Sequence, residues 1–198
     1  MIYSADGAAV IDAHLTDMKK YVDQATNNAV RYIENSVSVV LPNTASSWES
    51  VCYGSGKFIA VAQARNNAYS EDGVNWTETT LPDSQFWSSV CYGNGKFVTV
   101  TQDSNIAAYS EDGINWTQTT LPASEKWASV CYGNGKFVAV ASQSNVSAYS
   151  SDGINWTETT WNVGHDWSSV CYGNGKFVAV ASFNTNIAAY STDGVNWT

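Results

Sequence analysis

The segment WSSVCYGNGKF at residues 87–97, with AYSEDGINW following at 108–116, occurs in four near-copies along this chain. The cysteines mark the period, since they stand 39, 40 and 40 residues apart at Cys52, Cys91, Cys131 and Cys171. Repeats of this length are typical of a solenoid, a propeller or an array of modules. The repetition therefore limits the architecture before any residue chemistry is considered.

Each copy is divided by its turn residues into four short extended runs. In the second copy the predicted strands are 88–92, 96–101, 107–110 and 115–120. A Gly-Asn-Gly turn at 93–95 joins the first pair and supplies the positive-φ positions of a tight hairpin. Four antiparallel strands in a unit of this size are typical of a propeller blade. We therefore predict a mainly β protein, with a β-propeller of about four blades at residues 36–198.

Ring closure is predicted from an alignment of the two ends of the chain. The last copy stops at Thr198, before the equivalent of residues 78–82, and residues 38–42 carry the matching sequence Ser-Val-Val-Leu-Pro. An N-terminal strand is expected to complete the last blade, which would remove free sheet edges. Two alternatives stay open, because four blades is the lower limit for propellers. The chain is a piece of a longer array, or two chains combine their blades into a larger ring.

Residues 1–35 have a different pattern and form a separate predicted domain. Apolar side chains occur there at alternating spacings of four and three residues, which is the a/d pattern of a coiled coil. The predicted seam consists of Ile11, Leu15, Met18, Val22, Ala25, Ala29 and Tyr32. We predict an N-terminal α-helix that gathers several propellers into a homo-oligomer, a trimer. The alternative is an amphipathic helix that folds back on its own propeller.

The composition excludes several classes of function. The net charge is −9, so nucleic acid is a poor partner, and no apolar run has the length needed for membrane insertion. The cysteines occupy one equivalent strand position in four blades, so we expect free thiols that pack as small, buried apolar residues. The two histidines, His14 and His165, lie in different modules. Neither a metal site nor a cofactor is expected.

A second motif, Ser-x-Asp-Gly-x-Asn-Trp, begins at Ser70, Ser110, Ser150 and Ser191. Asp and Ser side chains bond nearby backbone N–H groups and glycine takes the left-handed position, so the motif predicts a turn. The motif resembles the Asp-box, or bacterial neuraminidase repeat, although that family's usual spacing is S-x-D-x-G-x-x-W. The resemblance implies a β-propeller in which the aspartate and serine hold the turn between the third and fourth strands. The tryptophan would pack into the blade.

The same family contains sialidases, so catalysis has to be weighed. Resemblance to a sialidase would imply three arginines around the substrate carboxylate, whereas this chain has two in all, Arg31 and Arg65. Glycoside hydrolysis by two carboxylates would need a unique acidic pair, and most acids here recur as turn residues. The loop acids without copies in every repeat are Asp83, Asp103, Glu125 and Asp166. We predict that the protein is not an enzyme; a glycoside hydrolase would require chains to share an active site.

The loops that differ between copies are the candidate binding surface. In propeller connectivity the loops after the second and fourth strands share one face, and these loops diverge here. They are rich in amide and hydroxyl groups with aromatic residues beside them, a combination that suits sugar rings. The predicted ligand-binding residues are Arg65, Asn66, Phe86, Gln102, Asp103, Lys126, Gln143, Trp161, His165 and Phe183. The alternative is that these loops vary because nothing constrains them.

An oligomerising helix ahead of an acidic Asp-box propeller resembles the C-terminal part of phage tail fibres and related receptor-binding or adhesion proteins. This resemblance implies a multivalent, non-catalytic module that binds a cell-surface glycan or protein receptor. Such a module would act on a virion or in the extracellular space. The alternative is a structural or assembly protein whose propeller binds a protein partner; photosystem assembly factors use comparable repeats.

Overall fold

The structure, a computed structural model, describes residues 40–42, 47–182 and 186–198. Every regular element in these ranges is a β-strand, and Val40–Thr198 forms one compact unit. The prediction of a mainly β protein is confirmed for this part of the chain. The predicted N-terminal helix and its apolar seam, at residues 1–35, lie outside the described residues.

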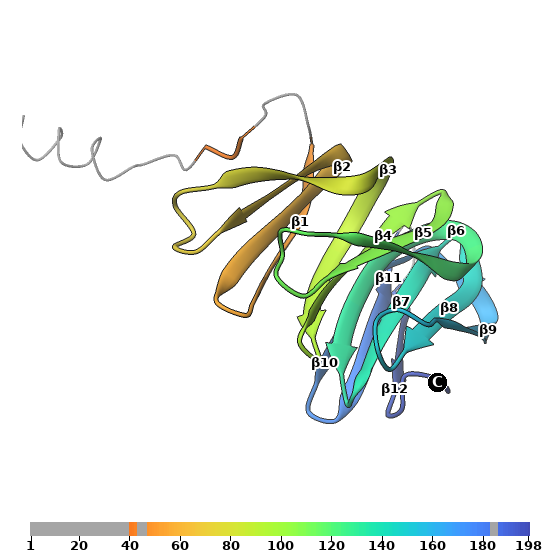
Figure 1. Ribbon diagram of the computed structural model, residues 1–198. Coiled ribbons are helices and arrows are strands. Elements are labelled where there is room, and N and C mark those ends of the chain that lie inside the picture. Colours follow the sequence, from red (N-terminus) through yellow and green to blue (C-terminus); the bar gives the residue numbers. More distant parts are fainter. Residues whose placement is uncertain (1–39, 43–46, 183–185) are drawn as a thin grey trace, which may run out of the picture. The chain divides into compact units, whose positions relative to one another are not determined.

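The strands follow one another through tight turns. Their bounds are β1 Trp48–Gly54, β2 Lys57–Ser70, β3 Thr77–Gly93, β4 Lys96–Gln102, β5 Ser104–Ser110, β6 Thr117–Gly133, β7 Lys136–Ser142, β8 Ser144–Ser150, β9 Thr157–His165, β10 Trp167–Gly173, β11 Lys176–Ala181 and β12 Ala188–Ser191. In the described residues they form two sheets, β1 to β9 and β10 to β12, each in chain order (Figure 1). At the β3–β4 hairpin, Asn94 (φ 47°) and Gly95 (φ 75°) both have positive φ, as a type I′ turn requires.

Two long strands, β3 and β6, each belong to two successive blades. The first part of β6 pairs with β5, up to Glu125, and the last part pairs with β7 from Lys126 onward. The predicted end of the fourth strand at residue 120 was therefore wrong, because β6 continues through Leu121 and Pro122. Its pairing with β5 shifts register between Thr120 and Glu125. Pro122, which has no N–H to donate, lies in that irregular stretch.

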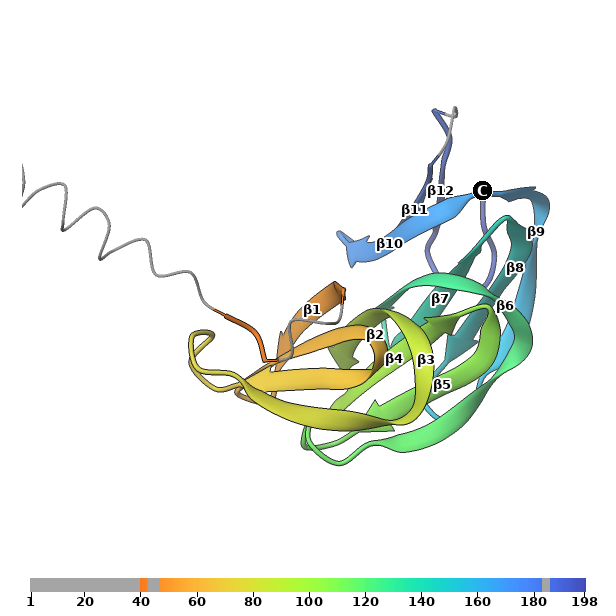
Figure 2. The same cartoon turned by 90° about the horizontal axis from the view of Figure 1, so that it is seen from above.

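Four repeating blades result, and they are numbered here by their residues. Blade 1 spans residues 48–80, blade 2 spans 87–120, blade 3 spans 127–160 and blade 4 spans 167–198. Seen from above, the blades follow one another in chain order from β1 to β10 (Figure 2). Successive blades contact each other through their first strands. The amide of Val130 in blade 3, for example, donates to Ser89 Oγ in blade 2 at 3.1 Å.

The core lies within and between neighbouring blades. The tryptophan that begins a blade is buried at Trp87, Trp127 and Trp167, because it packs against both its own blade and the preceding one. Strand β7 is buried along its whole central run, Phe137–Ala141. A strand that is apolar on both sides is expected where other sheets cover both of its faces.

A close contact between a tyrosine and a glycine repeats at each junction of blades. Gly93 ends the first strand of blade 2, and the ring of Tyr132 from blade 3 lies directly over it. A Cβ built on Gly93 would overlap that ring, so the glycine is required by close approach of the two blades and not by backbone conformation. The same contact joins Tyr172 to Gly133.

The structure does not show the predicted closure of the ring by an N-terminal strand. Val40–Pro42 belongs to neither sheet, and Val40 is 72% exposed. The other residues of that predicted strand, 38 and 39, lie outside the described ranges. In blade 4 the backbones of Thr198 and Tyr190 of β12 exchange two hydrogen bonds of 2.9 Å, at the position where β9 pairs with β8 in blade 3. β1 and β9 are the edge strands of the larger sheet.

The four cysteines are free thiols at equivalent strand positions. Burial raises the pKa of the Cys52 and Cys131 thiols to about 12, and raises that of Cys91 well above its usual range. The prediction of small, buried residues is wrong for Cys171, which is exposed on blade 4. The equivalent positions are covered by a following blade, and no described residues cover Cys171 in the same way.

Candidate functional site

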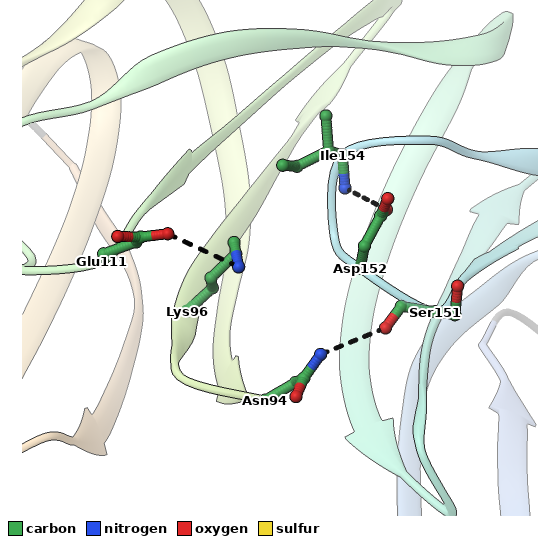
Figure 3. Close-up of polar contacts among 6 residues, drawn as sticks. All are labelled: Asn94, Lys96, Glu111, Ser151, Asp152 and Ile154. Atoms are coloured by element: carbon green, nitrogen blue, oxygen red, sulfur yellow. Dashed lines mark hydrogen bonds and ion pairs between the residues drawn. The ribbon is translucent and has the colours of Figure 1, made fainter.

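The two faces of the propeller carry different kinds of loop. On one face, Asn94 in the first hairpin of blade 2 donates from its side-chain amide to the carbonyl oxygen of Ser151, in the Asp turn of blade 3 (3.3 Å, Figure 3). Nearby, Lys96 forms an exposed ion pair with Glu111 at 3.5 Å (Figure 3). The repeated hairpins and the repeated Asp turns therefore share this face, as the sequence predicted.

The Asp turn is a self-contained hydrogen-bonding device. In blade 2, Asp112 Oδ1 accepts from the backbone amides of Ile114 and Asn115, both at 2.8 Å, and Oδ2 accepts from the Asn115 side chain at 2.7 Å. Ser110 Oγ accepts from the amide of Gly113, which has φ +76°. Each carboxylate oxygen is already engaged within the turn, and the other three repeats use equivalent bonds. This geometry supports the turn role predicted for the motif.

These bonds make the stability of the protein dependent on pH. The backbone N–H of Asn115, followed by the other donors, holds the pKa of the Asp112 carboxyl well below its usual range. Backbone donors do the same for Asp72 and Asp193. A carboxyl whose pKa is lower in the folded chain contributes stability above its unfolded pKa, about 3.9, and loses it as the pH falls further.

We therefore expect the free energy of unfolding to fall steeply below about pH 4. Urea denaturation between pH 7 and pH 2 would measure it. An Asp112→Asn variant should be less stable at pH 7 but should lose less stability on acidification, because one of the titrating groups is gone. A free energy of unfolding that stays constant down to pH 2 would contradict this role.

The divergent loops meet on the opposite face. Ser104 pairs with Glu125, and Ser144 pairs with His165, so the loop after each second strand lies beside the connection to the next blade. Between blades 3 and 4 these segments surround an open cleft of about 590 Å³, which we call the loop cleft. It is lined by Glu125, Gln143, Ser144, Asn145, Gly164, His165 and Asp166.

The loop cleft is polar and partly organised by its own contacts. Gln143 has φ 56°, which turns the chain sharply between β7 and β8, and its Oε1 accepts from Lys126 Nζ at 3.1 Å. Ser144 Oγ accepts from the amide of Val146, which holds the loop after the turn. The ring of His165 meets Trp167 edge-on at 5.4 Å. Two carboxylates, an imidazole, two amides and a hydroxyl thus surround one cleft.

The structure brings some of the predicted binding residues together and separates others. Gln143 and His165 line the loop cleft, and Lys126 reaches it through its bond to Gln143. Glu125 and Asp166 also line it, although they were not among the predicted binding residues. Their lack of copies in the other repeats was the signal that could have identified them.

A second group of predicted residues lies on blades 1 and 2. Phe86 is exposed on β3, where it pairs with Gln102 of β4. Arg65 donates to the carbonyl oxygen of Pro82 at 2.6 Å, so its guanidinium is held near β3. Asn66 is half-buried in β2, and Asp103 is exposed with φ 56°. Phe183 lies outside the described residues.

Trp161 is placed in the core and not on an open surface. It is 7% exposed, and its ring stacks on Trp197 at a centroid distance of 4.4 Å. Its indole N–H donates to Ser147 Oγ at 2.6 Å, and Trp167 contacts it at 4.0 Å. Neighbouring side chains therefore occupy the ring faces that a sugar would need.

The described residues contain no group of three or more His, Cys, Asp or Glu side chains arranged to hold a metal ion. They also contain no helix of the length and apolarity needed to cross a bilayer.

Comparison with known proteins shows the fold class. No family model matches the sequence, and no curated protein is similar to it. Among solved structures, virginiamycin B lyase from Staphylococcus aureus is similar with a TM-score of 0.71 and 15% identity, over 79% of this chain and 56% of that one. YCF48 from Cyanidioschyzon merolae has a TM-score of 0.62 and 18% identity, over 81% and 57%. The computationally designed Ika4 protein has a TM-score of 0.57 and 9% identity, over 77% and 94%.

These similarities establish a β-propeller-like fold. The chain spans little more than half the length of the virginiamycin B lyase and YCF48 chains that it matches. One of these neighbours is an enzyme by its name, and another structure is of YCF48 bound to a D1 peptide. At identities of 15% to 18% the fold is shared, and function has to be argued from the site itself.

Proposed function

We propose that the protein is a non-catalytic binding module that holds a neutral, hydroxyl-rich ligand, a cell-surface glycan, in the loop cleft. The observation that carries this proposal is the position of the cleft. It lies where the repeats diverge, whereas the shared turns are occupied with their own hydrogen bonds. Divergent loops on a rigid scaffold are where binding sites usually lie.

The chemistry of the cleft supports a neutral ligand. Carboxylates accept hydrogen bonds from hydroxyl groups, while amides such as Gln143 and Asn145 both donate and accept. Vicinal hydroxyls of a sugar match such a set of groups. An anionic glycan is a poorer ligand, because Glu125 and Asp166 line the cleft and the chain carries a net charge of −9.

The proposal that the protein is not an enzyme rests on the contacts and the number of its charged side chains. The aspartates with strongly lowered pKa values are the turn residues, in which backbone amides hold the carboxylates. Arg65 is bonded to the Pro82 carbonyl. A sialidase-like cluster of three arginines cannot be assembled within one chain, which has two.

Several weak sites acting together would give useful affinity at a cell surface. If the helix predicted at residues 1–35 gathers several chains, each added cleft raises the avidity for a repetitive glycan. This arrangement suits a receptor-binding protein on a virion or in the extracellular space. A module that binds a protein partner is the alternative function.

Glycan-array screening followed by titration calorimetry of the best neutral oligosaccharide tests the proposal. Glu125→Gln and Gln143→Ala should each weaken binding about tenfold, which corresponds to about 1.4 kcal/mol for a lost hydrogen-bonding group. The matched control is Glu111→Gln, the same substitution on the opposite face, which should leave the affinity unchanged. Binding that survives both cleft substitutions, or turnover of a chromogenic glycoside, would refute the proposal. A stable complex with a protein and no glycan binding would favour the alternative.

A further inference from the structure

Among the described residues, no neighbouring blade covers one side of blade 1 or the opposite side of blade 4. On blade 1, Val51 is 61% exposed, and Tyr53 and Val74 are also exposed; these three residues define face A. On blade 4 the exposed residues Cys171, Gly173, Val178, Val180 and Tyr190 define face B. Equivalent side chains inside the chain are covered by a neighbouring blade. Val170, the equivalent of Val51, is 5% exposed, and Val140, the equivalent of Val180, is 0% exposed.

Face A and face B are the two halves of the junction that already joins blades within the chain. At each internal junction a tyrosine ring lies over a glycine of the preceding blade, in the pairs Tyr92 with Gly54, Tyr132 with Gly93 and Tyr172 with Gly133. Face A presents the unmatched tyrosine, Tyr53. Face B presents the unmatched glycine, Gly173, where an added Cβ would meet no described atom within 4 Å.

A contact between a valine and a glycine also repeats at the junctions, with the valine on the preceding blade and the glycine on the following blade. Val138 of blade 3 lies against the turn glycine of blade 4, since a Cβ on Gly194 would approach Val138 Cγ2 to 2.7 Å. On face B the equivalent of Val138 is Val178, which is exposed. On face A the equivalent turn glycine is Gly73, where the nearest atoms belong to Phe58 of its own blade. The unmatched valine and the unmatched glycine are again on opposite faces.

Hydrogen-bonding groups complete the match. In the chain, the valine amide at the middle of each first strand donates to a serine of the preceding blade, in the pairs Val90 with Ser50, Val130 with Ser89 and Val170 with Ser129. Face A offers the amide of Val51, and exposed Ser169 offers the hydroxyl beside face B. The side-chain amide of Asn134, in the first hairpin of blade 3, likewise donates to the backbone carbonyl of Thr192. Asn174 and the Glu71 carbonyl are the equivalent groups on blades 4 and 1.

We propose that a second copy of this chain docks on these surfaces, with face A of each chain against face B of the other. The expected contacts are those of the internal junctions: Tyr53 on Gly173, Val178 on Gly73, and the Val51 amide on Ser169. Two different surfaces that match each other produce either a closed ring or a filament. Two arcs of four blades make a ring of about eight, which is within the usual range for propellers, whereas three arcs would exceed it.

Labelling of Cys171 tests this pairing in the full chain. Cys171 lies on face B, so a second copy would cover it, as the following blade partly buries Cys52, Cys91 and Cys131. We expect a maleimide to label Cys171 slowly in the wild-type chain, and at least about tenfold faster in Tyr53→Ser and Gly173→Leu variants, because the reagent needs an accessible thiol. Phe86→Ser is the matched control, since Phe86 is an exposed aromatic residue outside both faces. Peptide mass spectrometry identifies the labelled cysteine, and light scattering gives the mass.

Mixing the two variants provides the sharper test. A Tyr53→Ser chain retains Gly173, and a Gly173→Leu chain retains Tyr53, so a mixed pair has one intact junction. Cys171 of the Tyr53→Ser chain should regain protection, while that of the Gly173→Leu chain should not; their peptides differ in mass. Rapid labelling of wild-type Cys171 at high protein concentration would overturn the proposal. So would protection that neither variant reduces, or protection in a chain that light scattering shows to be a monomer, which would indicate closure within one chain.

Discussion

Replacing Trp127 by alanine is expected to lower the free energy of unfolding by about 3–5 kcal/mol, the usual range for a large buried aromatic residue. Trp127 is fully buried in the cluster that contains Val100, Leu121 and Ala141. Its indole N–H donates to the carbonyl oxygen of Ala123 at 3.2 Å, so the substitution also leaves that acceptor without its partner. Urea denaturation monitored by far-UV circular dichroism would measure the loss.

Phe86→Ala is the control for this prediction. Phe86 is an aromatic residue of similar chemistry, but it is exposed on β3. Its replacement should change the free energy of unfolding by no more than about 0.5 kcal/mol, as is usual for exposed positions. Equal losses in the two variants would mean that Trp127 does not hold blades 2 and 3 together in the way that its packing indicates.

Gly133→Ala is expected to have the second largest effect, a loss of about 1–3 kcal/mol from overpacking. The added methyl group would overlap the ring of Tyr172, which lies over Gly133 at the junction of blades 3 and 4. Either the ring or the two first strands must move apart. Because Val170 donates to Ser129 in the same junction, a shift of the strands also strains that hydrogen bond.

The same substitution at Gly173 separates local packing from association. No described atom lies within 4 Å of a Cβ at Gly173, so Gly173→Ala introduces no clash within one chain. Any loss of stability in Gly173→Ala should therefore depend on protein concentration, because it acts on pairing between chains. The loss in Gly133→Ala should be the same at every concentration. A large, concentration-independent loss at Gly173 would show that blade 4 is packed differently.

Local structure was predictable from the sequence because its determinants lie close together in the chain. Gly93-Asn94-Gly95 specifies a hairpin by its positive-φ positions, and Asp112 binds amides two and three residues ahead. Four copies of these signals predicted the number of blades and the face on which the shared turns lie. The predicted end of the fourth strand at residue 120 was wrong because β6 pairs with β5 again at Glu125 after a register shift, which depends on the partner strand.

The candidate site was only partly predictable. Gln143 and His165 were expected to bind ligand, and both line the loop cleft. Glu125 and Asp166 were recognised as acids without copies in every repeat, but their shared position depends on how two connections lie around the loop after β7. Trp161 showed the opposite error, since a tryptophan that occurs once looked available for binding. Its contacts with Trp167 and Trp197 place it in the core.

By itself, the sequence determined the repeat, the four-stranded blades, the turns and the acidic character of the protein. These follow from hydrogen bonds and conformational preferences that operate over a few residues. Only the tertiary structure decided which loops meet in the cleft, that Cys171 and Tyr53 lie on uncovered faces, and that those faces match. The reason is that each junction joins residues about 40 positions apart, such as Val130 and Ser89, through packing that no local segment specifies.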